Sequence, residues 1–183
     1  MNAQRMRTDA ALYRETSGRG APLVLLHGWA MNRQVFDGLR AQLAPHYAVT
    51  AVDLPGHGCS PWPPDCTLAR QLELLADAGP PDATLIGWSL GAQLALALAA
   101  GPLPRARRLV LIAGTARFAR ADGWEHGLAP TTLQRFAQSL EQDAGRTLAD
   151  FIDLQVRGSA HADEVRATLS GVLDGQARAR LPA

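Results

Sequence analysis

Hydrophobic runs alternate along the chain with segments whose apolar residues recur at helical spacing. Runs of mostly apolar residues, which are typical of buried strands, occupy residues 22–26, 47–54, 83–88 and 107–114. Helical spacing of apolar residues is found between them at residues 33–43 and 67–76, and the Ala/Leu-rich segment 90–100 is also typical of a helix. Apolar strands separated by helices predict a parallel sheet covered by helices on both faces. The predicted fold class is therefore α/β.

After residue 115 the pattern changes to helical spacing alone. Three successive helical faces are marked by Leu133, Phe136 and Leu140, by Leu148, Ile152 and Gln155, and by Val165, Leu169 and Val172. No strand pattern returns before the chain ends at Ala183. We therefore expect two parts, a sheet core over residues 1–114 and a helical cap over residues 115–183.

The sequence around Ser89 predicts a tight turn between a buried strand and a helix. Gly87 and Gly91 flank the serine at two residues' distance, in the pattern Gly-x-Ser-x-Gly. In that context the pattern is known as a nucleophile elbow, a strained turn that pushes the serine hydroxyl out at the end of the sheet. Because the helix begins at the serine, its dipole and free N–H groups can stabilise a developing oxyanion. Ser89 is the predicted nucleophile.

Two other loops follow predicted strands and bear on the same site. An oxyanion site needs two donors, and the N–H groups of Leu90 and Trp29 are the natural pair, the latter in the segment LLHGWAMN, residues 25–32. The alternative is that His27 and Trp29 are ordinary packing residues of the loop. His57, in DLPGHGCS, is not expected to be catalytic because the catalytic histidine of such a site follows the serine in chain order.

A serine nucleophile of this kind needs an acid and a histidine that follow later strands, and the sequence after Ser89 offers neither. His126 and His161 lie in the helical segment, Asp174 lies there too, and none of them follows a strand. We therefore expect the chain to stop after the cap, before the strands that would carry the acid and the base. Without a base Ser89 is a weak nucleophile. The apolar strand at 109–113 is also expected to form an exposed sheet edge.

Composition and charge argue against a nucleic-acid-binding or a membrane-spanning protein. The chain has 183 residues, of which 47 % are hydrophobic and 19 % charged, as in a globular protein with one core. Its net charge of +1 gives no basic surface for nucleic acid, and no apolar run is long enough to span a membrane. The two cysteines and the lack of a signal-like leader predict a cytoplasmic location. Neither a metal nor a cofactor is expected, since no ligand cluster is present.

The motifs LLHGWAMN, VDLPGHGCS, GWSLGAQLALALA and DFIDLQVRG together resemble the α/β-hydrolase superfamily. Within it, they are similar to the pimeloyl-acyl-carrier-protein methyl ester esterases of biotin synthesis, over residues 20–175. The family usually has a second glycine after the elbow, where this chain has Ala92. The resemblance implies that Ser89 is the nucleophile and that Trp29 and Leu90 contact the substrate. It also implies an acyl channel lined by the cap residues Phe151, Ile152, Asp153, Leu154 and Gln155.

The resemblance further implies a serine carboxylesterase that hydrolyses the methyl ester of a pimeloyl chain on an acidic carrier protein. Arginines on the predicted cap helices are candidates to contact that partner, namely Arg135, Arg146, Arg157 and Arg166. Residues 115–183 hold eight arginines against nine acidic residues, so these arginines are equally well explained as solvated helix faces. Two other functions stay open: a general hydrolase of small esters, thioesters or lactones, and a non-catalytic binding fragment or one half of a two-chain enzyme.

Overall fold

The computed structural model describes residues 11–101 and 106–177, and its centre is a five-stranded sheet in the order β1-β3-β2-β4-β5. The strands are β1 (Arg14–Ser17), β2 (Ala21–Leu26), β3 (Tyr47–Val52), β4 (Thr84–Trp88) and β5 (Arg108–Ile112). Strands β3, β2, β4 and β5 are parallel neighbours, as the apolar runs predict. The α/β class is confirmed.

One edge of the sheet is a strand that the sequence pattern does not predict. Strand β1 pairs antiparallel with β3, in a register that sets Arg14 opposite Val52 and Ser17 opposite Val49. Its sequence, RETS, is short and polar, so it lacks the apolar run by which the other strands are identified. An edge strand needs little apolar burial because only one of its sides is paired and much of it faces solvent.

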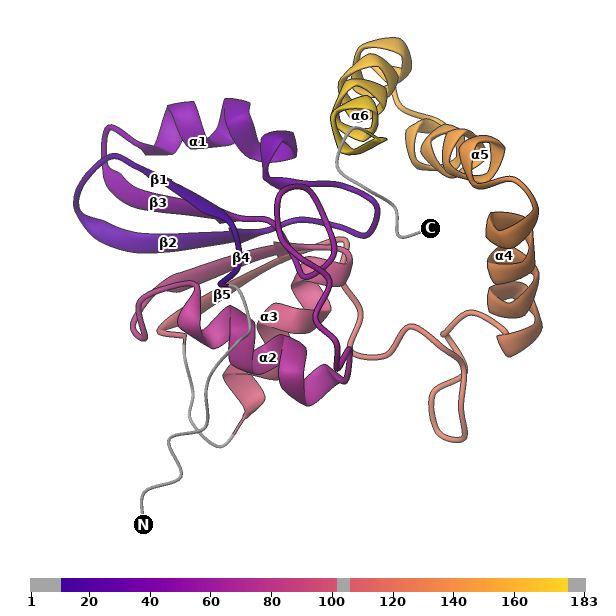
Figure 1. Ribbon diagram of the computed structural model, residues 1–183, viewed down its shortest axis with the longest axis horizontal. Helices are drawn as coiled ribbons and strands as arrows, with labels where there is room; N and C mark the ends of the chain where they lie inside the picture. The colour runs from indigo at the N-terminus through magenta and orange to yellow at the C-terminus, as the bar shows by residue number, and fades with distance from the viewer. Residues whose placement is uncertain (1–10, 102–105, 178–183) are drawn as a thin grey trace.

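Helices cover both faces of the sheet, as Figure 1 shows. Helix α1 (Asp37–Leu43) lies on one face, whereas α2 (Leu68–Asp77) and α3 (Leu90–Ala100) lie on the other. The segment predicted as one helix over 33–43 is divided, because a 3₁₀ turn, η1 (Arg33–Phe36), precedes α1. The hydroxyl of Thr67 accepts a hydrogen bond from the Arg70 N–H and so caps α2, as its position predicts.

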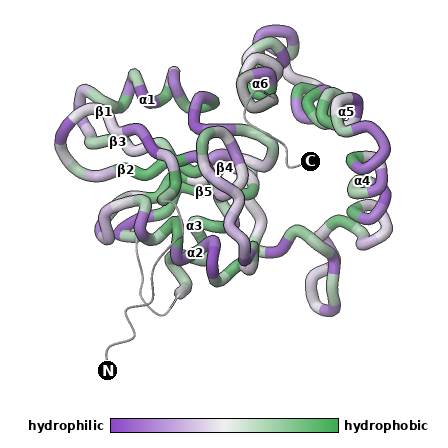
Figure 2. Tube along the Cα trace, in the orientation of Figure 1, coloured by the Kyte–Doolittle hydropathy of each residue, from purple (hydrophilic) through white to green (hydrophobic). Residues whose placement is uncertain are grey.

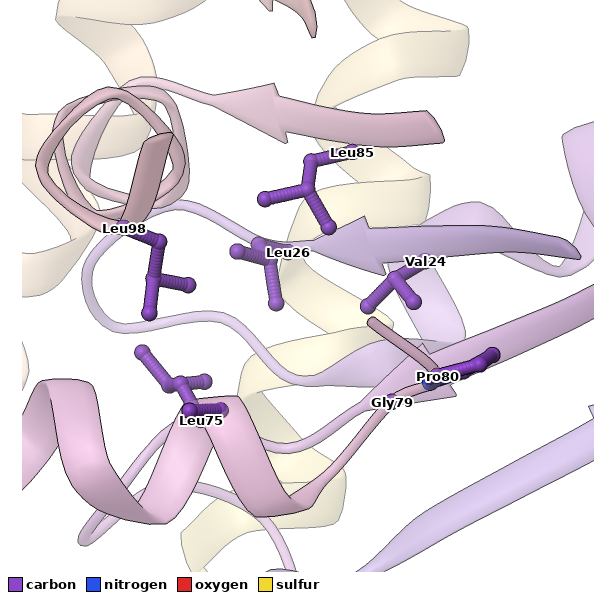
Figure 3. Close-up of a pocket in the computed structure, with 8 residues that line it drawn as sticks. Val24, Leu26, Leu75, Gly79, Pro80, Leu85 and Leu98 are labelled. Atoms are coloured by element: carbon purple, nitrogen blue, oxygen red, sulfur yellow. The ribbon is translucent and has the colours of Figure 1, made fainter. Parts of the chain in front are cut away.

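The main core lies between the sheet and helices α2 and α3. Hydrophobic residues gather in the central strands and in α3 (Figure 2). Figure 3 shows Val24 and Leu26 of β2 and Leu85 of β4 facing Leu75 of α2 and Leu98 of α3. The gap that these side chains leave is only about 10 Å³ and is apolar. It is a packing defect with no room for a substrate.

Three helices follow β5 and form an arc beside the sheet (Figure 1). They are α4 (Pro130–Gln142), α5 (Ala144–Val156) and α6 (Ala162–Ala177), which correspond to the three predicted helical faces. Residues 1–10 of the predicted core and residues 178–183 of the predicted cap lie outside the described residues. The division between core and cap at residue 115 stays a prediction. Within the described ranges, no helix combines the length and apolarity needed to cross a membrane.

A second apolar cluster joins this arc to the core. Met31, in the loop after β2, is fully buried against Ile152 and Val156 of α5 and Leu169 and Val172 of α6. The side-chain amide of Asn32 donates to the carbonyl of Val172 at 3.3 Å. The loop after β2 is therefore the attachment point of α5 and α6.

Strand β5 forms the outer edge of the sheet, and in the part of the chain that the structure describes no strand pairs with its free side. Its apolar side chains are exposed: Val110 and Leu111 by 44 % and Ile112 by 42 %. An unpaired apolar edge strand is a template for association with other chains. The exposed edge that the sequence predicts is thus present.

We predict that this edge makes the chain associate. Val110→Lys places a charge on the free strand and is expected to shift the chain toward monomer, because a charged edge resists strand pairing. Leu68→Lys, at another exposed apolar position, on α2, is the matched control and is expected to change little. Light scattering across a concentration series measures the effect, and a monomeric wild-type chain would contradict the prediction.

Candidate active site

Ser89 occupies the single residue between the end of β4 at Trp88 and the start of α3 at Leu90. Its backbone has φ 54° and ψ −113°, a conformation that residues other than glycine rarely adopt. The Ser89 N–H donates to the carbonyl of Ile112 in β5 at 2.9 Å, which anchors the strained turn to the neighbouring strand. The sequence prediction of a strained strand-to-helix turn at Ser89 is confirmed.

The two flanking glycines are required by close backbone contacts. A Cβ on Gly91 would lie 2.0 Å from the carbonyl oxygen of Leu26, and one on Gly87 would lie 2.3 Å from the carbonyl oxygen of Gly91. Neither distance is possible for real atoms, so α3 approaches β2 more closely than any side chain permits. Ala92, at the position where the family usually has glycine, is buried, and a Cβ on Gly114 would lie 2.5 Å from its methyl group.

The loop after β2 reaches the serine at Gly28. A Cβ on Gly28 would lie 3.4 Å from the Cβ of Ser89, so the peptide that follows, between Gly28 and Trp29, lies beside the turn. Among the residues that the structure describes, neither the Trp29 N–H nor the Leu90 N–H donates a hydrogen bond. Two unused backbone donors near a serine hydroxyl can together hold an oxyanion.

His27 is completely buried and uses both ring nitrogens. Its Nε2 accepts from the Leu54 N–H at 2.9 Å, and its Nδ1 lies 2.8 Å from the carbonyl oxygen of Gly28. Burial lowers the pKa of His27 to about 3, with the neighbouring His57 acting in the same direction. The ring of His57 packs edge-on against it at 5.3 Å, and burial lowers the pKa of His57 as well. His27 is therefore neutral and part of the loop's framework.

A buried carboxylate, which the sequence analysis missed, fixes the neighbouring turn. Asp53 accepts from the Arg33 N–H at 2.7 Å and the Cys59 N–H at 2.8 Å, and its carboxylate also pairs with the Arg33 guanidinium at 3.1 Å. Arg33 in turn contacts Glu15 of β1 at 2.5 Å. Hydrogen bonds from Arg33 and Arg40 lower the pKa of Glu15 to about 2. Strand β1 thus has an electrostatic role that its polar sequence alone does not reveal.

Three aromatic rings lie over the loop that carries Trp29. The Trp29 ring meets Phe136 of α4 at 5.4 Å and Phe151 of α5 at 5.3 Å, both edge-on, and the two phenylalanines are 5.9 Å apart. Such aromatic pairs stabilise a contact beyond the area that they bury. The sequence marks Phe136 only as one residue of a helical face, because its partners are 107 and 15 residues away.

The other predicted residues of α5 fall on different sides of the helix. Ile152 is buried against Met31, whereas Asp153, Leu154 and Gln155 are exposed. The side chain of Leu90 is half-buried and packs against the main core. Of the predicted channel segment, the structure brings Phe151 and Ile152 to the loop after β2.

The predicted partner-binding arginines also differ in their surroundings. Arg166 forms an ion pair with Asp153, and Arg146 lies 3.9 Å from Asp150 one helical turn away. Arg157 is exposed and, like the exposed Arg135, forms no ion pair with a described residue.

Within the described ranges, no histidine or carboxylate hydrogen-bonds the Ser89 hydroxyl. His126 is exposed in the loop before α4, and His161 is exposed at the start of α6, where its Nδ1 lies 3.9 Å from Oε2 of Glu164. Asp174 is exposed on α6. No three His, Cys, Asp or Glu side chains of residues 11–101 and 106–177 lie where they could hold a metal ion.

Comparison with known proteins gives a family match over most of the chain. The model of the alpha/beta hydrolase family matches residues 23–182. An esterase from Exiguobacterium antarcticum has a similar structure, with a TM-score of 0.76 and 23 % identity, over 90 % of this chain and 64 % of its own. At that identity the likeness concerns the fold.

Two curated relatives are closer in sequence, and both are named pimeloyl-[acyl-carrier protein] methyl ester esterase. The relative from Nitrosomonas europaea is 41 % identical over 91 % of this chain and 67 % of its own length. The one from Stenotrophomonas maltophilia strain R551-3 is 44 % identical over 85 % of this chain and 60 % of its own length. The chain thus spans about 60–67 % of the length of these relatives.

The close contact at Gly91 predicts a specific loss of stability. Gly91→Ala should lower the free energy of unfolding by about 1–3 kcal/mol or more, because the added methyl group overlaps the Leu26 carbonyl. Gly38→Ala in α1 is the control, since nothing lies within 4 Å of its Cβ position, and should raise stability by roughly 0.5–1 kcal/mol. Urea denaturation compares the two, and equal effects would contradict the close approach of α3 to β2.

The buried histidines predict how stability depends on pH. Below pH 6.5 the unfolded chain protonates His27, whereas the folded chain does so only near its pKa of about 3. The free energy of unfolding should therefore fall as pH drops from 6.5 to 5, by up to ~1.4 kcal/mol per pH unit for each such histidine. Glu15 adds a further loss of stability only at lower pH, because the pKa of its carboxyl is 4.5 in the unfolded chain.

Denaturation curves across this pH range test the assignment. His27→Asn should flatten the slope between pH 6.5 and 5, leaving the contribution of His57. His161→Asn, at an exposed ring, should retain the wild-type slope. A wild-type slope in the His27→Asn variant would show that this histidine does not resist protonation.

Proposed function

The chain belongs to the alpha/beta hydrolase family, and we propose that it hydrolyses carboxylic esters with Ser89 as its nucleophile. The observation that carries the proposal is the strained turn that sets Ser89 beside the backbone N–H groups of Trp29 and Leu90, which have no hydrogen-bond partner among the described residues. This combination supplies the nucleophile and the two oxyanion donors that acyl transfer uses.

The proposed reaction uses these atoms in two steps. The Ser89 hydroxyl oxygen attacks the ester carbonyl carbon while its proton passes to a solvent water molecule, and the electron pair displaced onto the carbonyl oxygen is held by the two N–H groups. Collapse of this intermediate expels the alkoxide, which takes a proton and leaves as the alcohol, and an acyl-serine ester remains. Water then attacks that ester, which releases the carboxylic acid and restores the serine hydroxyl.

We propose a methyl ester of a pimeloyl chain on acyl carrier protein as the substrate. The names of relatives that are 41 % and 44 % identical support this choice. The apolar surface of Trp29, Phe136 and Phe151 supports it too, since it can receive an aliphatic chain at the loop that passes Ser89 at Gly28. In this proposal residues 115–183 form the cap, and Asp153, Leu154 and Gln155 on α5 line the outer part of the channel.

The exposed arginines of the cap are the proposed contacts for the acidic carrier protein. Arg135 and Arg157 have guanidinium groups that no described carboxylate neutralises, so they are better placed for this than Arg146 and Arg166. The latter two must exchange an existing acidic partner for the carrier protein.

Release of methanol from methyl-pimeloyl-acyl carrier protein tests the proposal. Ser89→Ala should abolish the release of methanol that the wild-type chain catalyses, because no other described group replaces the nucleophile. Ser159→Ala, at an exposed position after α5, is the control and should retain wild-type turnover. Equal turnover in the Ser89→Ala variant and the wild-type chain, or none in the latter, contradicts the proposal. Equal rates on short acetate esters would instead favour a general esterase.

A further inference from the structure

The peptide between Gly28 and Trp29 is held from its carbonyl side. The Gly28 oxygen accepts from the Met31 N–H at 3.2 Å and lies 2.8 Å from Nδ1 of His27. A trans peptide directs its carbonyl oxygen and its N–H to opposite sides, and the described residues contain no cis peptide. Fixing the Gly28 oxygen therefore fixes the direction of the Trp29 N–H.

The tautomer of His27 follows from its other hydrogen bond. Nε2 accepts from the Leu54 N–H, so this nitrogen has no hydrogen, and the neutral ring must carry its hydrogen on Nδ1. Nδ1 then donates to the Gly28 oxygen. The end of β3 thus determines, through one rigid ring, which way the peptide after β2 is oriented.

The turn by itself is poorly suited to hold this orientation. Residues Gly28 to Met31 form a turn that the hydrogen bond from the Met31 N–H to the Gly28 oxygen closes, and its third residue, Ala30, has φ 60°. A positive φ at this position is normal for glycine and strained for alanine. A strained turn persists only when its surroundings impose it, and the bond from His27 is the shorter of the two at the Gly28 oxygen.

We propose that His27 is a positioning residue, which fixes the Gly28–Trp29 peptide so that the Trp29 N–H is directed away from the loop framework and toward the space beside Ser89. Two features support the direction: Gly28 lies against the Cβ of Ser89, and the Trp29 N–H has no partner among the described residues. The importance of this orientation for catalysis rests on the proposed function, whereas the orientation itself does not.

Two variants separate the two hydrogen bonds of the ring. In His27→Asn the side-chain amide N–H occupies the position of Nδ1 and keeps the donor to the Gly28 oxygen, but the acceptor for Leu54 is lost. In His27→Gln the longer side chain keeps an acceptor for Leu54, but the donor to Gly28 is lost. Each variant removes one buried hydrogen bond, so a purely structural role predicts similar effects of both.

The residual dipolar coupling of the Trp29 N–H bond, measured by NMR in a weakly aligning medium, reports the direction of that bond. We expect the wild-type chain and His27→Asn to give the same Trp29 coupling and His27→Gln to give a different one. The coupling of Leu85 in β4 serves as the reference and should be the same in all three. An unchanged Trp29 coupling in His27→Gln, or equal changes in both variants, would overturn the proposal.

The rate at which a fluorophosphonate labels Ser89 connects the orientation to chemistry. With the Trp29 donor turned away, His27→Gln should label about 10²-fold more slowly than the wild-type chain, and His27→Asn should stay within a few-fold of it. Absence of labelling in the wild-type chain contradicts Ser89 as the nucleophile, yet the dipolar couplings still decide whether His27 positions the peptide. Equal labelling of all three chains, together with a changed coupling, would overturn the link to catalysis.

Discussion

The contact between the first turn of α3 and the end of β2 is the constraint on which the rest of the site depends. With 2.0 Å between the Leu26 oxygen and the place where a Cβ of Gly91 would be, helix and strand meet through backbone alone. This approach leaves one residue, Ser89, to reverse the chain, and a single-residue reversal demands the positive φ that is observed. The strain is a consequence of the packing and is retained because β5, through the carbonyl of Ile112, and the buried core hold both sides of the turn.

The loop after β2 connects this turn to the remaining structure. Within a few residues it passes beside Ser89 at Gly28, contacts the aromatic residues of α4 and α5 through Trp29, and is buried against α5 and α6 at Met31. Its backbone is in turn fixed from β3 by His27. The loop after β2 therefore couples the position of the three C-terminal helices to the environment of the serine. A movement of those helices would displace the N–H groups beside Ser89.

Electrostatics secures the same region from the other side. The buried carboxylate of Asp53 accepts hydrogen bonds from the backbone of Arg33, just after the loop, and from that of Cys59, in the turn after β3. Arg33 and Arg40 then bind Glu15, which attaches the antiparallel edge strand β1. The buried negative charge of Asp53 is tolerated because several hydrogen-bond donors satisfy it. Removing any one of these donors would leave part of that charge without a partner.

The sequence by itself determined the elements whose signals are local. Apolar runs identified β2 to β5, helical spacing identified α2 to α6, and the Gly-x-Ser-x-Gly spacing located the strained turn at Ser89, because strand burial and a close approach at glycine leave direct marks in neighbouring residues. Only the tertiary structure decided what depends on residues far apart in the chain. It assigned the polar segment RETS to a sheet edge and joined Trp29 to Phe136 and Phe151. It also gave His27 two partners in the loops after two different strands, because hydrogen bonds and ring contacts between distant segments have no period in the sequence from which they can be read.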